Sequence, residues 1–484
     1  MRHIQWNGYF ACTYCMIRGR RLALGPNSTI NVFPYSSDVV ERRNEQIPVF
    51  AEQAVRGRRY DPDAHVYGVK GPSLLYYMVP SLVWCMGIDA MHGIFLGLSK
   101  LLTCLWFDAS YAGQLFSVHE LIDIVDQRLR NIKPPSNIQR IPHSIKTQLS
   151  FWKALEYKLW FLYYSLPVLL DILPDVYWRH HCKVVSAIRI VFQESVSFEQ
   201  IEAAEELLHA YVSDFEHLYG LRFMSINLHH LIHLPQIVRK LGPLWVFNCF
   251  VYEDLNGSIA GLIHGSRHAA TQVCSSVSAF LTLPQRLNEL DRYNPVRLFC
   301  ESMLTGGQMR FKVALEISRN LQIIGNFQPC NPIPPVIGNA LETDFNILNG
   351  RCRYFEKLRK NGILYVSDSY ARSIQKLPCY AVVRYDVPYL SKILYFICWT
   401  PCGHGCPPNC NVCLARYFCI VELYERVVWE AHTTPGVRLS YLNRVTPTGV
   451  IRAFPVEALS MLCFFMNIDG DYYIASPVNT LEVE

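Results

Sequence analysis

Three histidines within seven positions set the stretch NLHHLIHLPQ apart from its apolar surroundings. On a helix, His229 and His233 share one face, whereas His230 is rotated by about 100°. Cys12 and Cys15 form a C-x2-C pair far upstream, and two thiolates with two imidazoles can complete a tetrahedral zinc site. Spacing alone leaves two interpretations open. The histidines either share a structural zinc with the cysteines, or line a helical core and hydrogen-bond to the backbone.

Two further motifs combine acids with histidines. In DAMHGIFLG, Asp89 and His92 lie three residues apart at the start of an apolar helix, where they can share a metal or satisfy each other; we expect the second. Glu253 follows the aromatic run LWVFNCFVY, and Arg267 and His268 are expected further along the same helix. An acid in such apolar sequence is costly unless it is paired, bound to a metal or placed at a helix N-terminus.

A second cysteine cluster occupies the glycine- and proline-rich sequence CGHGCPPNCNVC. Its spacings are tighter than those of ordinary zinc fingers. The cluster is either a compact second zinc knuckle or a loop of free thiols. The four candidate ligands are Cys402, Cys406, Cys410 and Cys413.

The basic charge is concentrated near the N-terminus. Residues 1–60 hold nine arginines against four acids, which equals the net charge of +5 of the whole chain. The candidate phosphate contacts are Arg56, Arg58 and Arg59. A solvated surface is the simplest interpretation of such a run, and contact with nucleic-acid phosphates is the functional one.

The 18 cysteines do not by themselves indicate a secreted disulfide protein. The N-terminus MRHIQWNGYF lacks the apolar core of a signal peptide, so we expect a reducing, intracellular compartment. The most apolar stretch, residues 159–174, is broken by Pro167 and Asp171 and is short for a bilayer. We expect a buried helix pair there and no membrane partner.

The periodicity divides the chain into regions of different structure. Residues 1–80 are rich in turn formers, with a hairpin expected over 3–15. Helical patterns follow, and SFEQIEAAEELLHAYVSDFEHLYG contains a capping box at Ser197 and Gln200 with Gly220 as its stop.

The pattern changes in the last third of the chain. Helix is expected over 245–290 and weaker helices over 291–345, ending in the proline-rich NFQPCNPIPPVIGN, which we interpret as a linker. From about residue 350, short β-branched and aromatic runs bounded by turns predict a small antiparallel barrel or sandwich.

Taken in order, these motifs resemble those of a known family. WNGYFACTYC, GVKGPS, DAMHGIFLG, NLHHLIHLPQIVRKLGPLWVFNCFVYEDLNG and LIHGSRH occur in the same order and at similar spacing as in the transposases of CACTA (En/Spm-type) DNA transposons. The resemblance covers a little over half the chain, from residue 5 to about 270, and is looser beyond. The chain is also similar to the catalytic subunit of the vertebrate V(D)J recombinase.

The resemblance implies an RNase H-like core of the DDE type, interrupted by an all-helical insertion before the last catalytic acid. It implies a structural zinc shared by a cysteine pair and two histidines, with His230 left over. Asp89 and His92 match the DxMH motif, an additional element of the family, and Glu253 matches the catalytic glutamate. The zinc ligands would be Cys12, Cys15, His229 and His233.

We therefore predict an α+β fold that is predominantly helical, with an incomplete RNase H-like core, a large all-α insertion and a small β-rich C-terminal domain. Residues 1–80 would be the core remnant with the CxxC knuckle and a basic loop. The other regions are the helical insertion at 81–240, the helix of the last acid with following helices at 241–335, and the β-rich domain at 350–484 with its cysteine-rich loop.

The sequence differs from the family in lacking the first two catalytic aspartates, and this difference determines the activity that we expect. DDE chemistry needs two Mg²⁺ or Mn²⁺ ions held by three carboxylates, and in this family the first two aspartates precede the C-x2-C pair. Here eleven residues precede Cys12, none of them acidic, and the first acid is Asp38. We expect Mg²⁺ or Mn²⁺ chemistry only in a complete family member and no DNA cleavage by this chain.

The expected function is therefore binding by a truncated or decayed CACTA-like transposase. The partner would be DNA, contacted through the arginines, or another transposase chain. One alternative is a host-recruited scaffold that binds a host protein. Another is the C-terminal part of an active enzyme whose upstream exons are missing. The family resemblance favours the nucleus over the cytoplasm.

Overall fold

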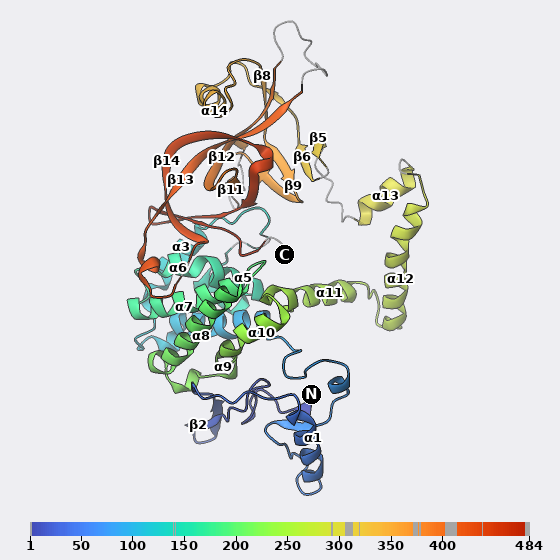
Figure 1. The fold of residues 1–484 in the computed structure, drawn as a ribbon, viewed down its shortest axis with the longest axis vertical. Helices are drawn as coiled ribbons and strands as arrows, with labels where there is room; N and C mark the ends of the chain where they lie inside the picture. Colours follow the sequence, from blue (N-terminus) through green and yellow to red (C-terminus); the bar gives the residue numbers. More distant parts are fainter. Residues whose placement is uncertain are drawn as a thin grey trace.

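The computed structural model describes residues 2–479 except 139, 141, 292–293, 305–312, 319, 371–375, 377–378, 402–413 and 438. Figure 1 shows four parts: an N-terminal segment (2–80), a helical body (91–241), a helical arm (250–304) that projects from it, and a β domain (313–479). The cysteine cluster at Cys402, Cys406, Cys410 and Cys413 lies outside the described residues.

The N-terminal segment is mostly irregular. Its strands form two antiparallel pairs, and its one α-helix, α1, spans Gln46–Gly57. The hairpin expected over 3–15 is wrong, because Trp6–Phe10 is a turn and the CxxC knuckle that follows it bends the backbone. The hairpin forms instead on either side of Pro26 and Asn27. The pairs are β1 (Arg2–His3) with β4 (Val69–Gly71) and β2 (Arg20–Gly25) with β3 (Ser28–Val32).

The helical body confirms the helical pattern read from the middle of the sequence. It begins with a π-helix, and most of its helices contribute to one large apolar core. Its elements are η2 (Met91–Ser99), α2 (Lys100–Phe107), α3 (Ile122–Arg130), α4 (Ile145–Gln148), α5 (Ala154–Leu159), η6 (Trp160–Tyr164), α6 (Ser165–Leu169), α7 (Asp175–Val191), α8 (Phe198–Tyr219), α9 (Ile226–His230), η8 (Leu231–His233) and α10 (Leu234–Leu241).

Helix α8 shows how closely local sequence determines structure here. The Ser197 side chain accepts a hydrogen bond from the Gln200 backbone N–H, and the Gln200 side chain accepts one from the Ser197 backbone N–H, as the capping box predicts. The helix ends at Gly220, whose φ of 96° is unfavourable for residues with a Cβ. The apolar stretch 159–169 is buried within the body, and no helix of the described residues is long and apolar enough to cross a membrane.

Two buried histidines of α7 make the helical body sensitive to acid. Burial lowers the pKa of His180 to about 4 and that of His181 to about 3. Both rings are therefore neutral in the folded chain, whereas the unfolded chain protonates them below about pH 6.5.

We expect stability to be full above pH 6.5 and to fall by about 2–5 kcal/mol by pH 4.5. Urea denaturation at both pH values, at constant zinc, measures the loss. Replacing both residues in a His180→Gln, His181→Gln variant should flatten this dependence. An unchanged slope in that variant would contradict the assignment.

The helical arm is formed by α11 (Phe250–Gly261), α12 (Ala269–Asn288) and α13 (Pro295–Leu304). The single helix expected over 245–290 is wrong. Helix α11 ends at Gly261, and His268 has a left-handed φ of 56° immediately before α12. Glycines at 257, 261 and 265 weaken the helix in this stretch. Arg267 and His268 are therefore not on the helix of Glu253.

The β domain confirms the β-rich C-terminal region. Its main sheet has nine strands in the order β15-β11-β12-β13-β14-β17-β16, with β8 on β12 and β7 on β8; β10-β9-β6-β5 form a second sheet. The strands are β5 (Val313–Ser318), β6 (Leu321–Ile324), β7 (Gln328–Pro329), β8 (Arg351–Phe355), β9 (Lys357–Lys360), β10 (Ile363–Val366), β11 (Tyr380–Arg384), β12 (Pro388–Thr400), β13 (Arg416–Val427), β14 (Leu442–Pro455), β15 (Leu459–Leu462), β16 (Phe464–Ile468) and β17 (Asp471–Ala475).

The β domain begins earlier than expected. Strands β5 and β6 form a hairpin where weaker helices were expected. The proline-rich stretch is not a linker, because β7 pairs with β8 and α14 (Pro335–Phe345) buries Ile337 in the core of the domain. Proline suits both elements. It lacks a backbone N–H and is therefore tolerated in an edge strand such as β7, which among the described strands pairs only with β8, and it fits the first turn of a helix such as α14.

All strand pairs in the described residues are antiparallel, and the N-terminal strands form only two-stranded pairs. The RNase H-like core is therefore not confirmed and stays a prediction.

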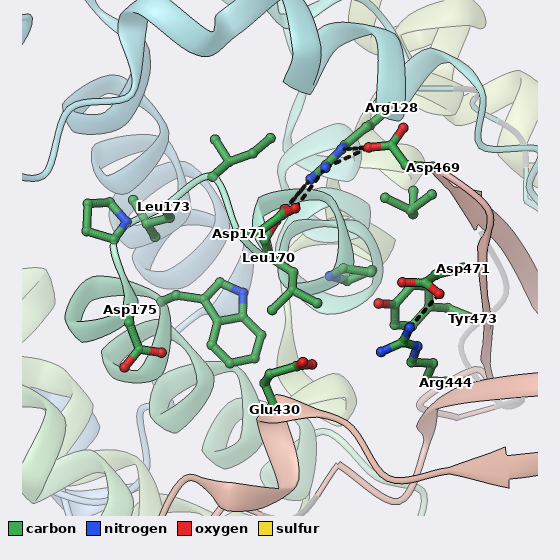
Figure 2. A pocket seen from close by; sticks show the side chains of 15 residues that line it. Arg128, Leu170, Asp171, Leu173, Asp175, Glu430, Arg444, Asp469, Asp471 and Tyr473 are labelled. Carbon is green, nitrogen blue, oxygen red and sulfur yellow. Dashed lines mark hydrogen bonds and ion pairs between the residues drawn. The ribbon is translucent and has the colours of Figure 1, made fainter.

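The helical body and the β domain meet along a seam. A cavity of about 680 Å³ on this seam, the first of two, is lined by residues of both parts (Figure 2). There the buried Arg128 of α3 forms ion pairs with Asp171 and with Asp469, which precedes β17. Arg444 of β14 pairs with Asp471 in the same cavity. Each of these arginines therefore has a carboxylate partner, and the pair of Arg128 with Asp469 joins the two parts.

Candidate metal centre

Four side chains lie close together, two from the N-terminal segment and two from α9 and η8 of the helical body. Cys12, Cys15, His229 and His233 each offer one ligand atom, and these atoms all lie within 4.8 Å of one another. The Cys15 Sγ lies 3.2 Å from His229 Nε2, which lies 3.2 Å from His233 Nε2. Tetrahedral zinc bonds of about 2.0–2.3 Å place ligand atoms roughly 3.3–3.8 Å apart. The set therefore fits a metal such as zinc.

The centre is closed to solvent. Both cysteines are 0% exposed, and His229 and His233 are 2% and 5% exposed. A site with four protein ligands and no open position holds a structural metal rather than a catalytic one. The donor set of two sulfurs and two nitrogens suits zinc and excludes Mg²⁺, which prefers oxygen.

The two cysteines are held by a backbone knuckle. The Tyr14 N–H points at the Cys12 Sγ at 3.4 Å. Cys15 forms an isolated antiparallel bridge with Glu41, and the Met16 N–H donates to the Val40 carbonyl at 2.9 Å. These contacts fix both thiols on one side of the turn.

The two histidines are presented by consecutive helical turns. Ser225 caps α9 by accepting the Leu228 N–H, and His229 lies in its last turn. A 3-10 turn, η8, then ends at His233, and Pro235 stands in the first turn of α10. The helix is thus not continuous, but four residues still return the second ring to the same side.

The electrostatics favour one thiolate before any metal binds. Burial opposes ionisation of Cys12, but hydrogen bonds from Cys15 and from the histidines outweigh it and hold its pKa well below the usual range. The hydrogen bond to Cys12, together with burial, raises the pKa of Cys15. Burial also lowers the pKa of His229, which keeps its ring neutral and able to bind a metal. Metal binding would release the remaining thiol proton.

Arg42 lies directly behind the knuckle. It is 2% exposed, and its Nε donates to the Cys12 carbonyl at 3.0 Å. Burial lowers its pKa, whereas electrostatic interaction with Cys12, and to a smaller extent with Cys15, acts in the opposite direction. This residue belongs to the arginine-rich segment, yet it supports the knuckle and is not available to phosphates. No local pattern in the sequence indicated this role.

His230 is not one of the four ligands, although it also forms a hydrogen bond with Cys12. Its ring packs edge-on against Tyr14 with centroids 5.8 Å apart, and it is not a member of the cluster. Its position agrees with the expectation that it is the leftover histidine.

A second group joins Asp89, His92 and Cys249. Asp89 accepts the backbone N–H groups of Met91, His92 and Cys249, and pairs with the His92 Nδ1. Burial works against ionisation of Asp89, but these hydrogen bonds outweigh it and lower its pKa. Asp89 and His92 thus contact each other at the helix start, as expected, and with Cys249 they also form a group of side chains that could hold a metal.

The same group reaches Glu253. The His92 Nε2 lies 3.5 Å from the Glu253 carboxylate, and both side chains are more than half exposed. Asp89 also fixes the chain before α11 through its contact with Cys249. Spacing could not predict this contact, since about 160 residues separate the two motifs. Among the described residues, Glu253 belongs to no group of three metal-binding side chains.

The three arginines proposed for phosphate contact lie at the end of α1. Arg56 pairs with the exposed Glu52 at 2.5 Å, and Arg59 is exposed. Arg58 is half-buried, and its Nε has no hydrogen-bond partner in the described chain.

Comparison of the chain with protein-family models, curated proteins and solved structures gives no match.

Proposed function

We propose that this chain is a zinc-stabilised remnant of a CACTA-like DDE transposase that binds DNA or another transposase chain and does not cleave DNA. One observation carries the proposal. Cysteines at the N-terminal end and histidines 214 residues downstream form one buried cluster, on the elements that lead into the helix of Glu253.

The DxMH group supports the same origin. The resemblance assigns Asp89 and His92 to the DxMH motif, and both stand beside Glu253, which it assigns as the catalytic glutamate. Two motifs about 160 residues apart in sequence thus meet where η2 and α11 begin. Zinc, when bound, supplies a crosslink between the N-terminal segment and the helical body, and takes no part in chemistry on DNA.

The exposed apolar surface of the arm supports the proposal that another protein binds there. No residue of α11 is buried, and Tyr252 and Leu255 are 58% and 53% exposed. On α12, Phe280 and Leu281 are each 64% exposed. Apolar surface of this extent marks an interaction site. In a complete core, the helix of the last acid would pack against the RNase H-like sheet.

We predict no cleavage by the chain itself. A lone carboxylate binds Mg²⁺ weakly, and in-line phosphodiester cleavage needs two ions held by three acids. Incubation with transposon-end DNA and Mg²⁺ or Mn²⁺ should give no nicks above those of the Glu253→Gln variant. Nicking that depends on Glu253 would refute this prediction.

We predict salt-dependent DNA binding through the end of α1. Each phosphate contact contributes about −0.9 to the slope of log K against log salt, so removing three should flatten the slope by about 2–3. An Arg56→Ala, Arg58→Ala, Arg59→Ala variant tests this by titration of duplex DNA at several salt concentrations. Its matched control replaces the exposed Arg222, Arg286 and Arg416.

Equal salt slopes in the two triple variants would show that Arg56, Arg58 and Arg59 do not contact DNA. A host-recruited interaction protein would then be the better candidate, because the exposed arm favours a protein partner. That candidate predicts a defined partner whose binding is lost in a Phe280→Asp, Leu281→Asp variant and kept when the exposed Thr282 is replaced by serine. Nuclear residence is part of the transposase proposal and not of this alternative.

A further inference from the structure

A second cavity lies on the seam between the helical body and the β domain, apart from the metal centre and the arm. Its volume is about 450 Å³, within the range of small-molecule sites. Helix α7 contributes Arg189 and Gln193, and the β domain contributes Arg384, Arg426 and Asn443. The charged residues in its lining are three arginines and one acid, Glu194, so the cavity is basic.

Arg189 is the unusual member. It is 3% exposed and donates from Nη2 to the Ser476 carbonyl at 3.0 Å. Its guanidinium carbon lies 3.3 Å from the centroid of the Tyr441 ring and 4.9 Å from that of Tyr163. No ion pair joins it to a carboxylate in the described part of the chain, and its buried Nη1 has no hydrogen-bond partner there. Two ring faces, one carbonyl and a hydrogen bond with the Tyr163 side chain offset only part of the cost of burying this charge.

The first cavity of the same seam contains a buried arginine that does have carboxylate partners, which makes it a useful comparison. Arg128 is 8% exposed, similar to Arg189, but it pairs with both Asp171 and Asp469. One side of the seam thus supplies two carboxylates to its arginine, and the other supplies none among the described residues. The missing negative charge is the observation that points to a ligand.

The other two arginines are exposed and able to close on an anion. Arg384 ends β11, and Arg426 on β13 is oriented by its Nε bond to the Asn443 Oδ1 at 3.0 Å. Guanidinium groups bind phosphate through paired N–H donors, which makes several of them around one cavity suitable for a compact dianion.

We propose that this cavity binds a small molecule through a phosphate group, with Arg189 at its base and Arg384 and Arg426 at its walls. The bound phosphate bridges α7 and the β domain, and so holds the seam closed where no protein ion pair does. The site is independent of the DNA contact at α1 and of the metal centre, and its failure leaves both proposals intact.

Calorimetric titration of the full chain with inorganic phosphate and with pyrophosphate, against chloride at equal ionic strength, tests the proposal. We expect saturable binding that weakens at least tenfold in an Arg384→Ala, Arg426→Ala variant. An Arg416→Ala control, on the same sheet but outside the cavity, should bind normally. The double variant changes exposed residues and avoids the folding risk of an Arg189→Gln variant, which should also lose binding.

Three results would overturn the proposal. Absence of saturable binding at millimolar phosphate is the first, and equal binding by the double variant and the control is the second. Loss of duplex binding in the double variant without any phosphate binding would identify a DNA contact and would also overturn it.

Discussion

Replacing Cys12 with serine is expected to lower the free energy of unfolding by at least about 3–5 kcal/mol, because metal binding to a closed site contributes directly to folding. Serine keeps the size of the side chain and removes the thiolate. The same change at Cys15, or His229→Ala and His233→Ala, should act similarly, since all four residues belong to one cluster. Urea denaturation and zinc content per chain measure the effect.

His230→Ala is the matched control for that series. This residue has the same side chain as its neighbour His229 and lies in the same helix, but outside the cluster. We expect a loss of about 1 kcal/mol or less and full zinc content. If His230→Ala and His229→Ala lost metal equally, the ligand set would be wrong.

Removal of the metal is expected to detach the N-terminal segment while the helical body stays folded. Most of the core of the body comes from its own helices, whereas the segment contributes apolar residues close to the cluster, among them Val32 and Phe33. Two hydrogen bonds also join the parts: the Phe33 N–H donates to the Met224 carbonyl at 2.7 Å, and the Tyr35 hydroxyl lies 3.2 Å from the His209 Nδ1. Chelation should therefore raise hydrogen exchange in residues 2–80 by at least tenfold and leave α7 and α8 protected.

Restoring zinc should reverse this effect, and restoring Mg²⁺ should not, because thiolate and imidazole ligands favour the softer ion. Exchange in the N-terminal segment that stays unchanged after complete metal removal would contradict a structural role for the centre.

Local signals in the sequence were reliable where one residue type has one structural consequence. Ser197, Gln200 and Gly220 fixed both ends of α8, because capping side chains and a positive φ act within a few residues. The errors lie where neighbouring segments compete. The stretch 3–15 has aromatic residues suited to strands, but the knuckle at Cys12 and Cys15 bends it. The proline-rich stretch looked like a linker and is part of the β domain.

The metal centre could be predicted in part. Spacing indicated half a site at Cys12 and Cys15 and made His229 and His233 its candidate partners, and the resemblance favoured zinc over a role in a helical core. Nothing in the sequence indicated that Arg42 would be buried behind the cysteines. The contact between His92 and Glu253 was also hidden, since it depends on how η2 and α11 meet and not on either motif alone.

X-ray absorption at the zinc edge of the purified full-length chain tests the central claim most directly. The account predicts two sulfur neighbours at about 2.3 Å and two nitrogen neighbours at about 2.0–2.1 Å. These neighbours should persist in the His230→Ala chain, and the Cys12→Ser chain should lose one sulfur. A protein that holds no zinc, or a metal surrounded by oxygen, would contradict the account.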